Sequence, residues 1–409
     1  MAALPVYVHV PAYYALLHGA GLAQLGWVLF AARLFDTVQE PLLGLLIDRP
    51  GRRLNAWLIG ATAVFALAFA GLWMPPSGPA ASITWLGIAL VLVYSAHSFL
   101  SIAYLAWGAS LDGPQARAHV LLGPAAWREG AGLVGVLLAS AIPAAVMAGD
   151  ASQVASSMGW YSAGFATLLF IAVAALLSGA PAWKPTGRPA TQWGKALRAV
   201  STNRRFMRLL PPYLLNALSV SLPATLVMLY IRDQLQAPEL GAIFLVAYFA
   251  AAMCCLPLWV RLAKRIGTAK AWQLGMLMAI GAFAGTSLLG PGDSMPFFFV
   301  CVAAGAALGA DLALPSVLFA QAISEAPGKA LYFSFYTLLG KLALALSGLS
   351  LPLLAAFGYQ PGNGASPLLV AIYAGLPCLL KLAAMFSLRR TREEISDLPC
   401  PATDGMCGK

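Results

Sequence analysis

Apolar segments long enough to cross a lipid bilayer recur along the whole chain, and this repetition constrains the fold most. The hydrocarbon core of a bilayer is about 30 Å thick, so a helix needs about 20 mostly apolar residues to span it. Only 10% of the residues are charged, whereas a soluble domain carries about 25%. We therefore predict an all-α membrane protein with twelve transmembrane helices. The predicted spans are 2–18, 22–47, 54–74, 82–111, 122–148, 158–180, 207–231, 239–260, 270–290, 294–323, 329–358 and 366–388.

Lys and Arg residues gather in alternate connections between these spans. By the positive-inside rule, such connections lie in the cytoplasm. An even number of spans then places both termini there, so the net charge of +10 reflects topology and does not indicate a nucleic-acid partner. We expect a monomer in the inner membrane of a bacterial cell. The basic residues of these connections are Arg49, Arg52, Arg53, Arg117, Lys184, Arg188, Lys195, Arg198, Arg204, Arg205, Arg261, Lys264, Arg265, Lys270, Lys329, Arg389, Arg390 and Arg392.

The longest polar connection, 181–206, divides the spans six and six. This division predicts an N-terminal half at 1–180, a cytoplasmic linker, a C-terminal half at 207–388 and a cytoplasmic tail at 389–409. The segment LIDRPGRRLNAW after the second span resembles RLAKRIGTAKAW after the eighth. Internal repeats of this kind build secondary transporters, whose substrate site lies near the bilayer midplane. We therefore expect a solute site between the halves.

The sequence lacks the motifs of an enzyme. It has no phosphate-binding Walker loop, and GAGLVG at 130–135 lies inside a predicted span and not after a strand. The four histidines are scattered without metal-ligand spacing. We therefore expect no enzymatic activity, no cofactor and no metal centre. His97 is open to two interpretations, a hydrogen-bonded core histidine or a residue that handles protons.

Three charges interrupt the second predicted span: Arg33, Asp36 and Glu40. Offsets of three and four residues bring them onto one helical face, within an arc of about 60°. A charge at the bilayer centre costs about 2.5–3.5 kcal/mol, so each one is a functional candidate. Two neighbouring carboxylates repel each other, and binding a cation or a proton relieves that repulsion. The alternative is that Arg33, Asp36, Glu40 and Lys341 only neutralise one another as buried pairs.

These residues also carry a resemblance. ARLFDTVQEPLLGLLIDRPGRR is similar to the second helix and following loop of the glycoside–pentoside–hexuronide:cation symporters, a family of the major facilitator superfamily. YSAHSFLSIAYLAWGASLDGPQARAHVLLGPAAWREGAGLVG resembles that family's helices four and five. GADLALPSVLFAQAISEAPGKALYFSFYTLLGKLALALSGL resembles its helices ten and eleven. The resemblance implies the major facilitator fold, with two six-helix halves.

The resemblance implies roles for several residues. Asp36 and Glu40 would form the coupling-cation site for Na⁺ or H⁺, with Arg33 and the intramembrane Lys341 as charge partners. Arg128 would lie on the substrate side.

Other candidates come from position in the chain. Tyr104 is a candidate cavity aromatic, and Asp311 either faces the cavity or caps the helix break before Pro315. The second loop predicts a cytoplasmic gate of Asp48, Arg49, Arg52 and Arg53.

The family's acidic sugar ligands lack acidic counterparts here. Residues 1–20 contain no Asp or Glu, and Ser101 stands at the acidic position of helix four. Galactoside specificity is therefore not expected. We predict cation-coupled symport of a small polar solute, for example a sugar or glycoside. The alternatives are an exporter or lipid-like substrate carrier of the same fold, and a non-transporting membrane sensor.

Overall fold

The protein is helical throughout the part of the chain that the structure describes. This computed structural model describes residues 10, 13–14, 22–49, 54–76, 78–110, 118–147, 151–179, 181, 193–360, 362 and 364–396. Most of the first predicted span, 2–18, lies outside these residues. Each later predicted span coincides with one helix or with two or three consecutive helices.

The N-terminal bundle consists of the helices before the long connection. Its helices are α2 (Leu22–Val38), α3 (Glu40–Asp48), α4 (Leu54–Leu72), α5 (Pro79–Gly108), α6 (Ala118–Met147) and α7 (Ala151–Gly179).

The C-terminal bundle consists of the helices after it. They are α9 (Arg204–Leu229), η2 (Tyr230–Gln234), η3 (Pro238–Leu240), α10 (Gly241–Ile266), α11 (Thr268–Thr286), α12 (Ser294–Ala322), α13 (Lys329–Gly348), α14 (Ser350–Ala356), α15 (Pro367–Val370), η4 (Ala371–Gly375) and α16 (Leu376–Ser396). In the described part of the chain, eight helical segments are long and apolar enough to cross a membrane.

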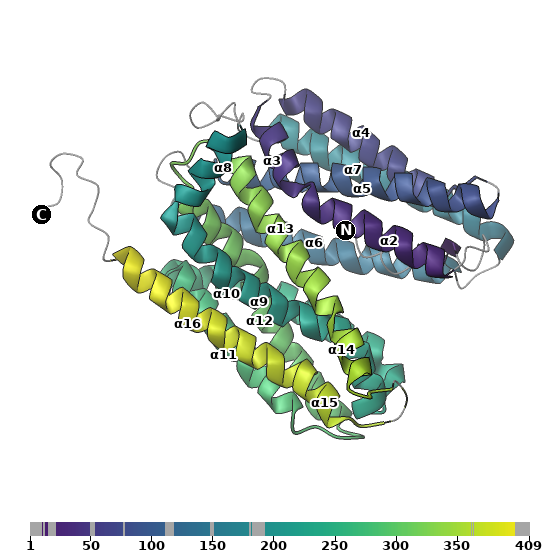
Figure 1. Cartoon of the computed structure of the whole chain (residues 1–409), viewed down its shortest axis with the longest axis vertical. Coiled ribbons are helices and arrows are strands. Elements are labelled where there is room, and N and C mark those ends of the chain that lie inside the picture. Colours follow the sequence, from purple (N-terminus) through teal and green to yellow (C-terminus); the bar gives the residue numbers. More distant parts are fainter. Residues whose placement is uncertain are drawn as a thin grey trace, which may run out of the picture.

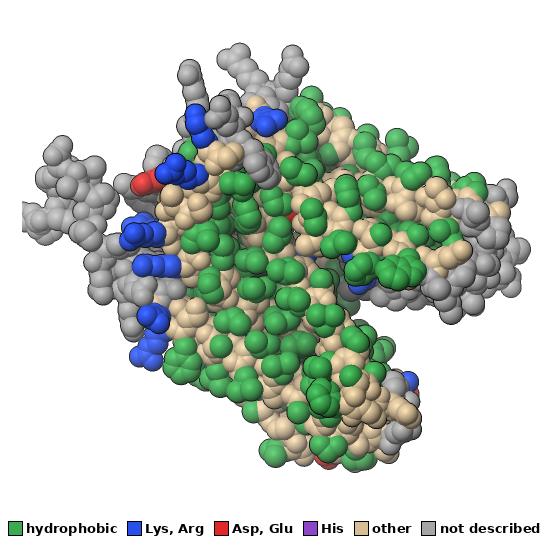
Figure 2. Space-filling model, viewed as in Figure 1, with side chains coloured by type: hydrophobic (Ala, Val, Ile, Leu, Met, Phe, Trp, Pro, Cys, Tyr) green, Lys and Arg blue, Asp and Glu red, His purple; other side chains and the backbone are tan. Residues whose placement is uncertain are grey.

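The two bundles form a V (Figure 1). They meet near α3 and α13 and diverge toward the far ends of α2 and α14. In the space-filling view this divergence is an open notch, and most of the visible Lys and Arg side chains lie along the edge opposite the notch (Figure 2). Apolar side chains cover much of the surface elsewhere, as expected for helices that face lipid.

Pro41 explains the junction between α2 and α3. Proline has no N–H to donate to the carbonyl four residues earlier, so it interrupts the helical hydrogen-bond ladder. Gln39 nevertheless keeps helical angles, with φ −70° and ψ −20°. Its N–H donates to the Phe35 carbonyl and its own carbonyl accepts from Leu43, both at 3.0 Å. The chain therefore continues in nearly the same direction, and Asp36 and Glu40 are both buried.

Gly44 allows the two bundles to touch. A Cβ atom at this position would lie 2.8 Å from the Leu331 Cα atom and 2.6 Å from the Ser334 Oγ atom of α13. Real Cβ atoms do not come this close to other atoms, so any larger residue would push α3 away from α13.

The long connection between the bundles contains a helix that the sequence did not predict. This helix, α8 (Trp193–Thr202), buries Ala196 and Val200 and exposes Lys195 and Arg198. The last helix of the chain, α16, continues through Ser396, past the predicted end of the last span at residue 388.

Candidate functional site

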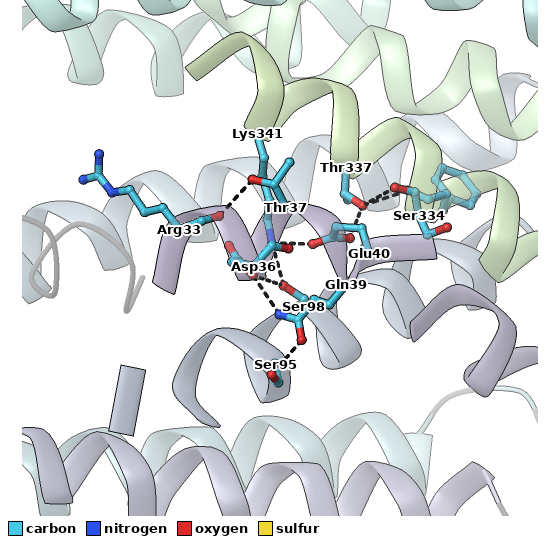
Figure 3. Close-up of polar contacts among 11 residues, drawn as sticks. Arg33, Asp36, Thr37, Gln39, Glu40, Ser95, Ser98, Ser334, Thr337 and Lys341 are labelled. Carbon is cyan, nitrogen blue, oxygen red and sulfur yellow. Dashed lines mark hydrogen bonds and ion pairs between the residues drawn. The ribbon is translucent and has the colours of Figure 1, made fainter. Parts of the chain in front are cut away.

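Lys341 of α13 lies between the two carboxylates of the second predicted span (Figure 3). Its Nζ atom is 2.5 Å from Asp36 Oδ1 and forms an ion pair with Glu40 Oε1. The side chains of Asp36 and Glu40 are 7% and 1% exposed, whereas that of Lys341 is 24% exposed. Because α2 and α3 belong to one bundle and α13 to the other, these ion pairs join the two bundles.

Neutral oxygen and nitrogen groups of α5 and of Gln39, the residue between α2 and α3, complete the surroundings of Asp36. Ser98 Oγ donates to Asp36 Oδ1 at 3.0 Å and accepts from Lys341 Nζ at 2.7 Å. Gln39 Nε2 donates to Asp36 Oδ1 at 3.1 Å, and Ser95 Oγ donates to Gln39 Oε1 at 2.7 Å. The ammonium group of Lys341 therefore occupies a point where oxygens from three helices converge.

Glu40 has a partner of its own on α13. Thr337 Oγ1 donates to Glu40 Oε2 at 2.5 Å, while Glu40 Oε1 faces Lys341. We call Asp36, Glu40, Ser98, Thr337 and Lys341 the Lys341 cluster. Hard cations prefer oxygen ligands of this kind, and the cluster holds two carboxylates for one lysine.

Arg33, the third charge of the predicted face, takes a different direction. Its side chain is exposed and points away from Lys341 (Figure 3).

Asp48 and Lys329 tie the bundles together at the edge opposite the notch. Asp48 Oδ1 accepts from the Ala330 N–H at 3.1 Å, and its Oδ2 accepts from the Leu331 N–H at 3.0 Å. The carboxylate thus caps the N-terminus of α13, where the helix dipole favours negative charge. A second tie runs from the C-terminal bundle to the N-terminal one: Lys329 Nζ donates to the Ala109 carbonyl at the C-terminus of α5, at 2.9 Å.

Of the other predicted gate residues, the structure describes Arg49 alone. Arg49 is exposed, and Arg52 and Arg53 lie outside the described residues.

Burial raises the pKa of the Asp48 carboxyl to about 6, although its two backbone hydrogen bonds act to lower the pKa.

A cavity of about 820 Å³ lies among α4, α5, α6 and α7, and Tyr336 of α13 contributes to its wall. Three predicted substrate-side residues, Ser101, Tyr104 and Arg128, line it. His97 lines it too, with its ring 5.9 Å from that of Phe65. The structure therefore brings these predicted residues to one cavity. Ser101 and Tyr104 lie on α5, the helix that contributes Ser98 to the Lys341 cluster, and Arg128 lies on α6.

Arg128 is paired within its own helix and also reaches the other bundle. Its Nε and Nη2 atoms donate to Glu129 Oε1 at 2.9 and 2.5 Å. Nη2 also donates to Ser316 Oγ of α12 at 3.1 Å.

Asp311, the fourth predicted substrate-side residue, lies in a different place. It is not among the described residues that line the cavity, and its side chain is only 5% exposed. Asp311 Oδ2 is 2.6 Å from Lys381 Nζ of α16, and Oδ1 accepts from Trp272 Nε1 of α11 at 2.9 Å. Asn216 of α9 accepts from Lys381 at 2.8 Å and donates to Asp311 at 3.1 Å. We call these four residues the Lys381 cluster.

Sequence reasoning missed Lys381, although a signal was present. It is the one charged residue within the predicted span 366–388. A charge that must enter a bilayer needs a partner, and Asp311 is the one charged residue within the span 294–323. Pairing these two isolated charges would have identified the cluster.

Comparisons with known proteins identify the class of this chain. A sequence-family model described as MFS/sugar transport protein matches residues 1–392, and the chain therefore belongs to this family of the major facilitator superfamily. A search of curated protein sequences gave no match.

Solved structures agree with this class. The Escherichia coli fucose:proton symporter is 14% identical, with 95% of each chain covered and a TM-score of 0.71. A bacterial homologue of the iron transporter ferroportin in an outward-facing state is 14% identical, with 96% of each chain covered and a TM-score of 0.73. The proton:xylose symporter is 15% identical over 93% of this chain and 89% of its own, with a TM-score of 0.58. These likenesses confirm the prediction of the major facilitator fold. The protein is a multi-pass membrane transporter and not an enzyme.

Proposed function

We propose that this transporter couples the movement of a small polar solute, such as a sugar or glycoside, to a cation by alternating access. The observation that carries this proposal is Lys341, an ammonium group from one bundle held between two buried carboxylates of the other. The sequence resemblance to the glycoside–pentoside–hexuronide:cation symporters supports the same role for Asp36 and Glu40.

The charges of the Lys341 cluster suggest how a cation would be exchanged. Two carboxylates and one lysine leave one negative charge in excess, and this excess attracts Na⁺ or H⁺. A bound cation competes with Lys341 for the same oxygens. When it displaces the lysine, it weakens the ion pairs that join α13 to α2 and α3, and so changes the balance between the two arrangements of the bundles.

α5 connects this event to the solute. Ser98 contacts Asp36 and Lys341, and Ser101, one turn later on α5, lines the cavity with Tyr104. We propose that Ser101, Tyr104 and Arg128 contact the solute, and that a shift of α5 transmits the state of the cluster to them. Two structural relatives are described as proton symporters, which favours H⁺ as the coupling ion.

The gate and the orientation follow from the same geometry. Asp48, with Arg49, Arg52 and Arg53, forms a cytoplasmic gate that is closed when Asp48 caps α13. The Lys and Arg residues along the edge opposite the notch mark the cytoplasmic side by the positive-inside rule. The notch then faces outward, both termini are cytoplasmic, and the protein resides as a monomer in an inner membrane.

Transport by charge-neutralised variants tests the coupling site. The purified protein is reconstituted into vesicles, and accumulation of labelled fucose, xylose and neutral glycosides is measured under Na⁺ and pH gradients. Asp36→Asn and Glu40→Gln should abolish cation-driven accumulation, because the cation loses half of its charged oxygen ligands. Exchange of solute down its own gradient should persist.

Glu239→Gln is the matched control, because Glu239 is exposed and outside both clusters. It should behave like the parent protein. If both cluster variants accumulate solute as the parent does, Asp36 and Glu40 are not the coupling site. A buried-pair role predicts a different pattern, in which single variants misfold and a joint change of Lys341 and one carboxylate restores normal transport.

A lipid-like solute is the second candidate. It is favoured by the cavity wall, where apolar side chains such as Leu58, Leu169 and Leu176 outnumber polar ones. Saturable uptake of a neutral sugar would argue against it.

A further inference from the structure

Glu129 is a charged residue of the cavity with no role in the coupling site. It lies on α6 directly after Arg128, and both side chains line the cavity. The side chains of Arg128 and Glu129 are 24% and 23% exposed. Both are therefore accessible to a solute and also held in a largely apolar environment.

Glu129 accepts most of the hydrogen bonds that the Arg128 guanidinium donates. Arg128 donates three hydrogen bonds. Two of them, from Nε and Nη2, go to Glu129 Oε1, and the third goes from Nη2 to Ser316 Oγ. The guanidinium is thus committed to a carboxylate that the protein itself provides. Hydrogen bonds between two oppositely charged groups are among the strongest in proteins.

This pairing sets the net charge that a solute meets. Arg128 and Glu129 are the only Lys, Arg, Asp or Glu among the described residues that line the cavity, and their charges cancel. An anionic solute would have to displace Glu129 from Arg128 or approach its carboxylate. A cationic solute would face Arg128 in the same way. Either encounter is unfavourable in a cavity whose wall is mostly apolar.

We propose that Glu129 is a specificity-determining residue that satisfies Arg128 internally and so restricts the cavity to solutes without net charge. This inference rests on the proposed solute site, but it concerns charge selectivity and not coupling. Without Glu129, Arg128 would become an anion-binding group.

Ligand-induced stabilisation of the purified full-length protein tests this without any ion gradient. The unfolding temperature is titrated with three polyols that differ in charge: glucose, glucuronate and N-methylglucamine, each matched for ionic strength with NaCl. A ligand that binds the folded state raises the unfolding temperature by mass action. Glucuronate and N-methylglucamine should have little effect on the parent protein.

Two variants should invert this selectivity in opposite directions. Glu129→Gln should gain affinity for glucuronate by about tenfold or more, the size expected for one charge-assisted hydrogen bond. Arg128→Met should gain affinity for N-methylglucamine. Glu129→Asp, which keeps the charge, should resemble the parent. If one variant does not fold, the other still decides.

The proposal is overturned if the parent binds glucuronate at least as tightly as glucose. It is also overturned if the folded charge-altered variants gain no affinity for the ion of opposite charge. Failure of the proposed symport would appear differently, as a loss of gradient-driven accumulation in vesicles with the binding pattern intact.

Discussion

Two lysine–carboxylate clusters lie in the apolar interior, and they differ in what they connect. The Lys341 cluster joins α13 of one bundle to α2 and α3 of the other. The Lys381 cluster joins α9, α11, α12 and α16, which all belong to the C-terminal bundle. In the alternating-access mechanism proposed above, one bundle moves relative to the other, so the first cluster would break in each cycle and the second would stay closed.

The two clusters are built to match this difference. Lys381 is 1% exposed, and both oxygens of Asp311 accept hydrogen bonds from the protein. Lys341 is 24% exposed and shares two carboxylates that outnumber it. A buried ion pair is costly to open unless another partner is available. At the Lys341 cluster, water can reach the lysine, and the second carboxylate is an additional partner for it. The Lys381 cluster has one carboxylate, and its lysine is buried.

Removing each lysine should give the largest contrast. Lys381→Met leaves the Asp311 carboxylate buried without its counter-charge, and should lower the free energy of unfolding by about 3–5 kcal/mol. Lys341→Met should cost clearly less, because a cation or proton can replace the ammonium. Thermal unfolding of the purified variants measures both. Adding Asp311→Leu to Lys381→Met should restore most of the loss, and equal losses for the two lysines would contradict the comparison.

A methyl group at Gly44 should disturb only the cluster that crosses between bundles. Gly44→Ala should weaken the contact between α3 and α13 by about 1–3 kcal/mol, because the new Cβ overlaps α13. Distances between spin labels at the exposed positions Arg49 and Glu325 should shift toward longer values. Gly60→Ala is the matched control, since a Cβ there meets no atom within 4 Å. Unchanged distances in Gly44→Ala would mean that α3 and α13 do not need this close approach.

Acidification should favour the closed gate. The pKa of Asp48 is raised to about 6 when it is buried against α13, so the closed state binds a proton more readily than an open state with a solvated carboxyl. Lowering the pH from 7 to 5 should therefore stabilise closure by about 1 kcal/mol, and this gain is lost as the pH rises through 6. The same label distances report it.

Asp48→Asn supplies the control for this pH effect. It should remove the pH dependence and slow turnover with little change in solute affinity. A pH response that persists in Asp48→Asn would assign the titration to another group.

Removing one neutral hydrogen-bond donor from each cluster should give the smallest effects. The effect should appear as reduced stability for the Lys381 cluster and as altered cation dependence for the Lys341 cluster. Trp272→Phe deletes a donor to Asp311 and should lower stability by about 1 kcal/mol without altering coupling. Ser98→Ala deletes a donor to Asp36 and should change cation dependence with little effect on stability. The reverse assignment would indicate that the Lys381 cluster is the one that opens during transport.

Much of this protein could be predicted from the sequence because the decisive signals are local. Hydropathy over about 20 residues located the spans, since the bilayer imposes one length on every helix. The spacing of Asp36 and Glu40 placed them on one helical face, and the resemblance pointed to Lys341 as their partner. Their roles in coupling stay predictions, as does membership of the glycoside–pentoside–hexuronide:cation symporters.

The tertiary structure decided which side chains meet across helices. Arg33 shares the helical face of Asp36, yet its exposed side chain points away from Lys341. Asp311 was a candidate for the cavity, but α16 approaches α12 and supplies Lys381 instead. The need for glycine at position 44 comes from Leu331 and Ser334 on another helix. Helix periodicity determines the face on which a residue lies, but only the packing of the helices determines what lies opposite that face.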